Sequence, residues 1–267
     1  MATSLADKRA AFRRLHDAGC FVLPNPWDVG SAVVLQHLGF KALATTSAGM
    51  AWSMGRADGA VGLDEALRHF AQIVQASDLP VNADFENALA DSPDDVATNV
   101  GLAVATGLAG LSVEDYSGKA LYDFDLAVAR VAAARAAIDR TGAGVLLTGR
   151  AEGFLRGAPD LAEVIRRLQA FSAAGADCLY APAIREESQI RAVVQAVAPK
   201  PVNLLQVGIP VATAASLGVR RISIGGALAG VAYGAAHAAA KEIAENGTFA
   251  GLAASPGGRI LNKIFAR

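Results

Sequence analysis

Three carboxylates and an arginine follow short apolar runs in the middle of the chain. Asp84 and Glu86 come directly after one run, Glu114 ends the next, and Arg150 follows a third. Asp84 and Glu86 are two residues apart on an extended segment, so both side chains face the same way and repel each other unless a cation lies between them. Because no Cys or His accompanies them, these carboxylates predict an all-oxygen site for Mg²⁺ or Mn²⁺.

An alternative is that Asp84 and Glu86 begin a loop and bond local backbone amides, while Glu114 starts a turn. Three carboxylates at successive strand ends favour the metal site. Arg150 strengthens that hypothesis, because a guanidinium stays charged and binds a carboxylate or phosphonate through two parallel hydrogen bonds. The alternative role for Arg150 is an ion pair with Glu152 or Glu114.

Small and hydroxyl-bearing residues fill the segment Thr45-Thr46-Ser47-Ala48-Gly49. Their hydroxyls and backbone amides could hold an anion, although such a segment is also typical of an ordinary turn.

Tyr116 and Lys119 are the candidates for acid and base chemistry, because both follow Glu114 closely and could reach the site when a loop closes. The alternative places Lys119 in a surface turn and packs Tyr116 at a rim. The four histidines fall in predicted helices and receive no catalytic role. Trp27 is expected to wall the mouth of the site.

These residues need a scaffold that brings successive strand ends together. Alanine-rich segments of helical character, such as 124–140 and 160–174, separate the apolar runs. Alternating strands and helices imply an α/β protein with a parallel sheet, and eight such units in 267 residues fit a TIM-type eight-stranded β/α barrel. We expect one domain over residues 1–267, with a helical tail from about residue 241. The predicted strands are residues 20–23, 42–45, 80–83, 110–113, 144–148, 178–181, 201–205 and 221–224.

The composition favours small-molecule chemistry. Hydrophobic residues make up 53% of the chain and charged residues 18%, with 24 Lys and Arg against 25 Asp and Glu. This balance leaves no basic stripe for nucleic acid and no polybasic segment for a membrane surface. The apolar stretch 225–240 is too short to span a bilayer and is expected to be a tightly packed helix. The amino terminus does not read as a secretory signal, so we expect a cytoplasmic protein.

An ordered set of motifs resembles the isocitrate lyase and phosphoenolpyruvate mutase superfamily. The resemblance covers the chain from Leu23 to about Ala227. The matching segments are Asn25-Pro26-Trp27-Asp28, Thr46-Ser47, Asp58, Ala83-Asp84-Phe85-Glu86, Val113-Glu114-Asp115, Gly149-Arg150-Ala151-Glu152, Ala174-Gly175-Ala176-Asp177 and Pro201-Val202-Asn203.

The resemblance implies a β/α barrel whose last helices are exchanged between subunits of a homodimer or homotetramer. It also implies a 2-oxo or 2-hydroxy acid bound at Mg²⁺ and an enolpyruvate-type intermediate that the ion stabilises. Asp58 would orient metal-bound water, and the backbone of Thr46, Ser47 and Ala48 would bind the substrate carboxylate. By the same resemblance, the substrate site includes Trp27, Asp28 and Asn203.

The chain also departs from the family pattern. It lacks the Lys-Lys-Cys-Gly-His loop of the cysteine-dependent lyases, and residues 114–123 run directly into a helix where the mutases have a longer gating loop. We therefore expect a Mg²⁺-dependent lyase or decarboxylase that breaks a C–C bond in a small dicarboxylic acid. The alternatives are a phosphonopyruvate mutase or hydrolase, which acts on a P–C bond, and a barrel that binds a dicarboxylate without turnover.

Overall fold

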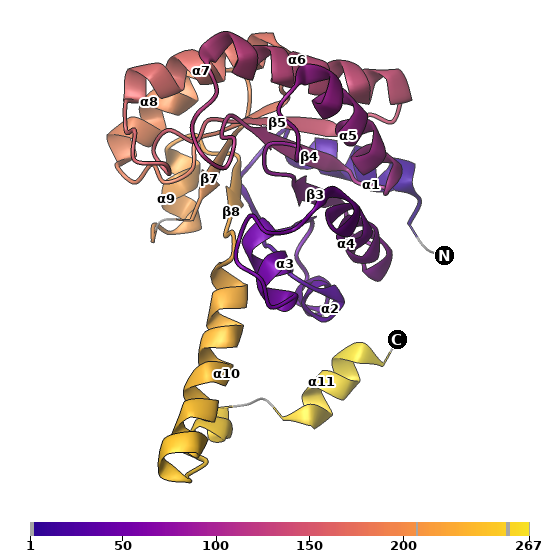
Figure 1. Ribbon diagram of the computed structural model, residues 1–267, viewed down its shortest axis with the longest axis vertical. Helices are drawn as coiled ribbons and strands as arrows, with labels where there is room; N and C mark the ends of the chain where they lie inside the picture. Colours follow the sequence, from indigo (N-terminus) through magenta and orange to yellow (C-terminus); the bar gives the residue numbers. More distant parts are fainter. Residues whose placement is uncertain (1–2, 207, 255–256, 267) are drawn as a thin grey trace.

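Eight short strands form one parallel sheet in the residues that the computed structural model describes, 3–206, 208–254 and 257–266 (Figure 1). Each of the eight predicted apolar runs overlaps one of these strands, so the strand predictions are confirmed. The strands are β1 (Phe21–Leu23), β2 (Leu43–Ala44), β3 (Val81–Asp84), β4 (Gly110–Glu114), β5 (Leu146–Arg150), β6 (Cys178–Tyr180), β7 (Val202–Leu205) and β8 (Arg221–Ser223).

The sheet curves into a nearly closed barrel, as predicted. Its strand order is β1-β8-β7-β6-β5-β4-β3-β2. The two end strands approach each other where the amide of Ala44 donates to the carbonyl of Pro24 at 3.0 Å. Glu114 of β4 is the direct register partner of Arg150 of β5. The register therefore brings the predicted acidic and basic residues to the same end of the barrel.

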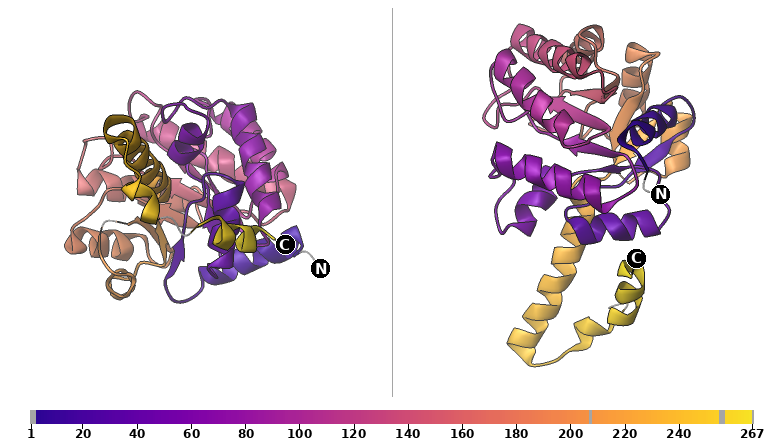
Figure 2. Two further views of the ribbon diagram at one scale, coloured as in Figure 1. Left: turned by 90° about the horizontal axis from the view of Figure 1, so that it is seen from below. Right: turned by 90° about the vertical axis from the view of Figure 1, so that its right-hand side faces the viewer.

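Helices cover the outside of the barrel (Figure 2). Their ends follow local signals: Pro93 occupies the first turn of α5 behind the capping residue Ser92, and Asp160 caps α7 through the amides of Ala162 and Glu163. The helices are α1 (Leu5–Leu15), α2 (Val29–His37), α3 (Ser47–Ser53), α4 (Leu63–Ala76), α5 (Pro93–Ala105), α6 (Phe124–Thr141), α7 (Leu161–Ala173), α8 (Glu187–Val197) and α9 (Val211–Ser216).

The amino-terminal end of the barrel is filled by apolar side chains. Phe12 of α1 is fully buried and packs with Leu23, Ala44 and Leu146. A β-carbon at Gly110 would lie only 2.7 Å from the Phe12 ring, so the absence of a side chain at this position permits the close approach. The cavities described below lie at the opposite end, where the strands finish.

A helical arm leaves the barrel after β8. It consists of α10 (Ala227–Asn246), the short 3₁₀ helix η1 (Ala250–Ala254) and α11 (Gly258–Phe265). Figures 1 and 2 show α10 projecting away from the barrel and α11 turning back toward α2. The Phe265 ring lies against Gly30 of α2.

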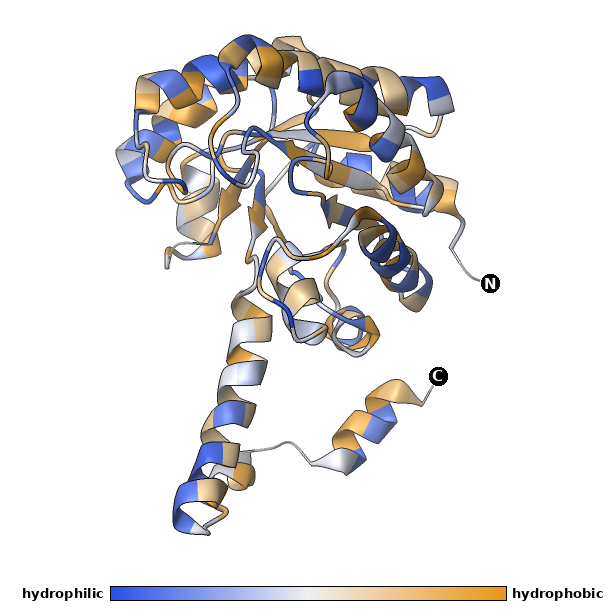
Figure 3. Ribbon diagram, viewed as in Figure 1, coloured by the Kyte–Doolittle hydropathy of each residue, from blue (hydrophilic) through white to orange (hydrophobic). Residues whose placement is uncertain are grey.

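The arm is apolar but mostly uncovered. Figure 3 shows hydrophobic residues interspersed along it, and the exposed ones include Val231, Tyr233, Phe249, Leu252 and Ile260. Residues 225–240 lie largely within a helix, α10, as predicted. The prediction that this helix is tightly packed is wrong within this chain, because Ala229 is the one residue of α10 that is buried among those the structure describes. None of the helices in the described ranges is both long and apolar enough to cross a membrane.

Candidate active site

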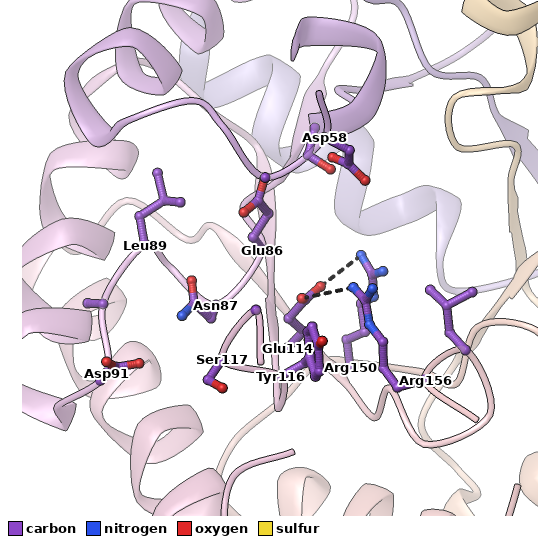
Figure 4. A pocket seen from close by; sticks show the side chains of 15 residues that line it. Asp58, Glu86, Asn87, Leu89, Asp91, Glu114, Tyr116, Ser117, Arg150 and Arg156 are labelled. Atoms are coloured by element: carbon purple, nitrogen blue, oxygen red, sulfur yellow. Dashed lines mark ion pairs between the residues drawn. The ribbon is translucent and has the colours of Figure 1, made fainter. Parts of the chain in front are cut away.

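Two adjoining cavities lie at the carboxyl ends of the strands. The outer cavity, of about 660 Å³, is formed mainly by the loops after β3, β4 and β5 (Figure 4). The inner cavity, of about 170 Å³, reaches down among the strand ends. The residues shared by the two linings are Ser47, Asp58, Arg150 and Leu155.

Arg150 stands at the junction of the cavities and is surrounded by carboxylates. Its Nη1 lies 3.0 Å from Asp84 Oδ1 and 3.2 Å from Glu114 Oε2, and its Nε donates to Glu152. Both ion pairs that the sequence offered as the alternative role for Arg150 are therefore formed. They do not remove Arg150 from the site, because its side chain lines both cavities.

The loop after β2 fixes the orientation of Asp84. The second oxygen of its carboxylate accepts hydrogen bonds from the Ser47 amide at 3.1 Å and the Ser47 hydroxyl at 3.2 Å. The amide of Asp84 donates to Thr45 Oγ1 at 2.9 Å. Asp84 thus bonds a neighbouring loop rather than its own, and its two oxygens face Ser47 and Arg150.

Two carboxyl groups of the site, those of Glu86 and Glu114, have raised pKa values. Burial, together with repulsion from Asp84 and Asp58, raises the pKa of Glu86 to about 7. Burial is also the main cause that raises the pKa of Glu114 to about 8, with Arg150 opposing the shift and Glu152 adding to it. A cation placed among these carboxylates would favour their ionised forms.

The donor geometry limits what kind of metal site can form. Within the described ranges, no group of three or more His, Cys, Asp or Glu side chains is arranged to hold an ion by itself. Mg²⁺ commonly takes only one or two protein carboxylates and keeps several waters. The residues present fit an ion of that kind, bound by few direct ligands and surrounded by carboxylates that accept hydrogen bonds from its waters.

A buried arginine clamps the loop that carries Glu86. Glu86 has a left-handed backbone with φ of 49°, which is unfavourable for a side-chain-bearing residue and must be maintained by its surroundings. Arg130 of α6 donates at 2.6 Å to each of the carbonyls of Asn87, Ala90 and Asp91. We infer that these three bonds hold the loop, and with it Glu86, beside the cavity.

Most of the predicted site residues come together here. Thr46, Ser47, Ala48 and Asn203 line the inner cavity, and Asp58 lines both cavities; Glu86, Glu114 and Tyr116 line the outer one.

Three predicted residues lie elsewhere. Lys119 is exposed in a tight turn that Ser117 closes, and it is not among the residues that line either cavity. Asp28 caps α2 by accepting from the Ser31 amide at 2.7 Å, and Trp27 packs against Gly49. Their roles in catalysis and substrate binding stay predictions.

The sequence reasoning missed a second arginine at the mouth. Arg156 donates from Nε to Glu152 Oε2 at 2.8 Å, and its guanidinium lies 4.0 Å from the centre of the Tyr116 ring. Figure 4 shows it beside Arg150, with both guanidinium groups near Glu114. The four-residue spacing from Glu152 to Arg156 was a signal for this pair, but it did not indicate which way the arginine would face.

Asp115 has a structural role beside the site. Its Oδ1 accepts from the Glu152 amide at 2.7 Å, and its Oδ2 lies 3.0 Å from Arg167 Nη1 of α7. This buried ion pair fixes the start of the loop that carries both Glu152 and Arg156.

Similarity to known proteins agrees with this architecture. Residues 12–244 match the phosphoenolpyruvate phosphomutase family. A crystal structure of a lyase or mutase candidate from Burkholderia cenocepacia J2315 is 44% identical, superposes with a TM-score of 0.96 and covers 98% of each chain.

Two further relatives carry named activities. An oxaloacetate decarboxylase of Paraburkholderia xenovorans is 32% identical over 230 residues, which are 80% of this chain and 74% of that protein. The crystal structure of a 2,3-dimethylmalate lyase, a member of the superfamily of phosphoenolpyruvate mutase and isocitrate lyase, is 29% identical with a TM-score of 0.86 and covers 99% of this chain and 95% of that one. Both named activities break carbon–carbon bonds.

Proposed function

Because this chain belongs to the phosphoenolpyruvate phosphomutase family, we propose that it is a metal-dependent lyase or decarboxylase that cleaves a C–C bond in a small 2-oxo or 2-hydroxy dicarboxylic acid. The observation that carries the proposal is the meeting of Asp84, Glu114 and Arg150 at the junction of the two cavities. The decarboxylase and lyase activities of the relatives described above support C–C chemistry.

The ion would be Mg²⁺ or Mn²⁺. Asp84 would bind it directly, while Glu86, Glu114 and Asp58 would accept hydrogen bonds from its waters. When bound, a divalent ion polarises a carbonyl oxygen and stabilises the negative charge that develops as the bond breaks. Burial, with added repulsion from neighbouring carboxylates, raises the pKa of Glu86 and of Glu114, and a cation bound between them would offset this cost of ionisation.

The side chains around the inner cavity would bind and orient the substrate. Thr46, Ser47 and Ala48 would receive its carboxylate, and Asn203, whose amide group also bonds Ser223 and Arg221, would contribute to the lining from β7. Arg150 would balance the negative charge that grows on the substrate as the bond breaks. Tyr116, in the outer cavity, is the candidate proton donor.

The first test is pyruvate release in a coupled assay. We expect at least one of oxaloacetate, 2-methylmalate and 2,3-dimethylmalate to release pyruvate with Mg²⁺ and to stop doing so with a chelator, and phosphonopyruvate is tested in the same panel. Release from phosphonopyruvate alone would indicate P–C chemistry instead. Calorimetric binding of a dicarboxylate without any product would support a non-catalytic binding barrel. Release that a chelator leaves unchanged would contradict the metal site.

We also propose that the helical arm joins two or more copies of the chain. Its exposed apolar residues need a cover that this chain does not supply. We expect a dimer or tetramer in light scattering coupled to size exclusion, and we expect Val231→Asp on α10 to shift it toward the monomer. Lys241→Gln, on the same helix, is the matched control. A monomeric parent protein would contradict the proposal.

A further inference from the structure

We propose that Arg156 selects substrates that carry a second carboxylate, by binding this distal group in the outer cavity. The inference rests on the proposed function, which places the 2-oxo or 2-hydroxy acid end of the substrate in the inner cavity. It assigns a specificity-determining role to Arg156 in the loop after β5.

The two cavities differ in size, and each suits a different end of the substrate. The inner cavity, at about 170 Å³, suits a group of a few atoms, whereas the outer one, at about 660 Å³, has room for the remainder of a longer acid. Arg150 lines both cavities, but Arg156 lines only the outer one. Arg156 therefore lies where the far end of a substrate would be.

The charges of the outer cavity leave one place for a second carboxylate. Asp58, Glu86 and Asp91 line its walls and would repel an anion. The cations among the described lining residues are Arg150 and Arg156. The side chain of Arg150 is 12% exposed and shared among three carboxylates, while that of Arg156 is 36% exposed and bonds Glu152 through its Nε, with Glu114 3.7 Å from its Nη2. Arg156 is thus the cation that an incoming carboxylate can reach.

The guanidinium of Arg156 is held with its binding edge free. Its Nε is bonded to Glu152, which is fully buried, and one face lies against the Tyr116 ring. Its Nη2 is 3.7 Å from Glu114 Oε1, too far for a hydrogen bond. Within the described part of the chain, neither Nη atom makes a hydrogen bond, so both can donate to one carboxylate in parallel.

A neutral group at this position would bind less well. It would displace water from Arg156 without replacing the charge-assisted hydrogen bonds, and sites built to bond a polar group discriminate strongly against analogues that lack it. The geometry therefore predicts preference for an acid with a distal carboxylate over the methyl ester of that carboxylate.

Calorimetry with Mg²⁺ tests this with malate, its 4-methyl ester and oxalate. We expect the parent protein to bind malate about 10- to 100-fold more tightly than the ester. Arg156→Gln should remove this preference by raising the Kd of malate. The Kd of oxalate, which fits the inner cavity, should stay within about twofold of the parent value. Arg156→Lys should show a reduced preference, because Lys keeps the charge but not the paired donors. Arg166→Gln, on the outside of α7, is the control and should match the parent.

The outcomes separate the two proposals. If the parent binds oxalate but Arg156→Gln still prefers malate to the ester, the role of Arg156 is overturned and the proposed function stands. The same conclusion follows if the parent binds malate and the ester equally. If the parent binds none of the three with Mg²⁺, the proposed function fails, and the role of Arg156 fails with it.

Discussion

Asp84→Asn will abolish metal-dependent turnover and leave the barrel folded. We expect kcat/KM to fall by about a thousandfold or more, which corresponds to about 4 kcal/mol of lost transition-state stabilisation. Asp84 is the proposed direct ligand, and its two carboxylate oxygens are held in place by Ser47 and Arg150. Asn has nearly the same shape, so the packing survives, but it lacks the charge that attracts a divalent ion.

The measurement is pyruvate release over a Mg²⁺ titration, with circular dichroism to verify the fold. Asp64→Asn is the control, because Asp64 lies in the exposed first turn of α4 and outside both cavities. We expect Asp64→Asn to follow the parent curve. If Asp84→Asn retained parental activity at low Mg²⁺, Asp84 would not be a metal ligand.

The barrel could be predicted because its signals are local. Each strand is a short apolar run, and helices such as α7 begin at a capping residue that the sequence shows directly, here Asp160. The grouping of Asp84, Glu114 and Arg150 followed from one topological fact, that the carboxyl ends of parallel strands meet at one end of a barrel. The structure confirms this grouping through their ion pairs.

The rest of the site depends on contacts between loops, which spacing does not encode. Arg130 lies in α6, about 40 residues from the carbonyls that it holds, and nothing in its own segment indicates that role. Arg156 lies on a loop whose start is held by Asp115 and Arg167, and its own segment does not indicate these contacts. The exposure of α10 does not follow from its composition, because a helix rich in small apolar residues does not tell whether its partner belongs to the same chain. The family resemblance was the signal for a partner in another subunit.

Arg150→Met is expected to cause the largest loss of stability among the variants considered, together with loss of activity. Asp84, Glu114 and Glu152 would lose the cation that they share, and removing one member of a buried ion pair costs about 3–5 kcal/mol. Denaturant unfolding should be measured in the presence of a chelator, so that a bound metal cannot replace the missing charge. The parent under the same conditions is the reference.

Two further variants separate the charge of Arg150 from its shape. Arg150→Lys keeps the charge and should recover most of the stability, but a lysine cannot donate to Asp84, Glu114 and Glu152 from one planar group, so activity should stay low. Adding Glu114→Gln to Arg150→Met removes one of the unpaired carboxylates and should restore part of the unfolding free energy, because the two residues are in direct contact. Strict additivity of the two changes would mean that the Arg150–Glu114 pair does not stabilise the site.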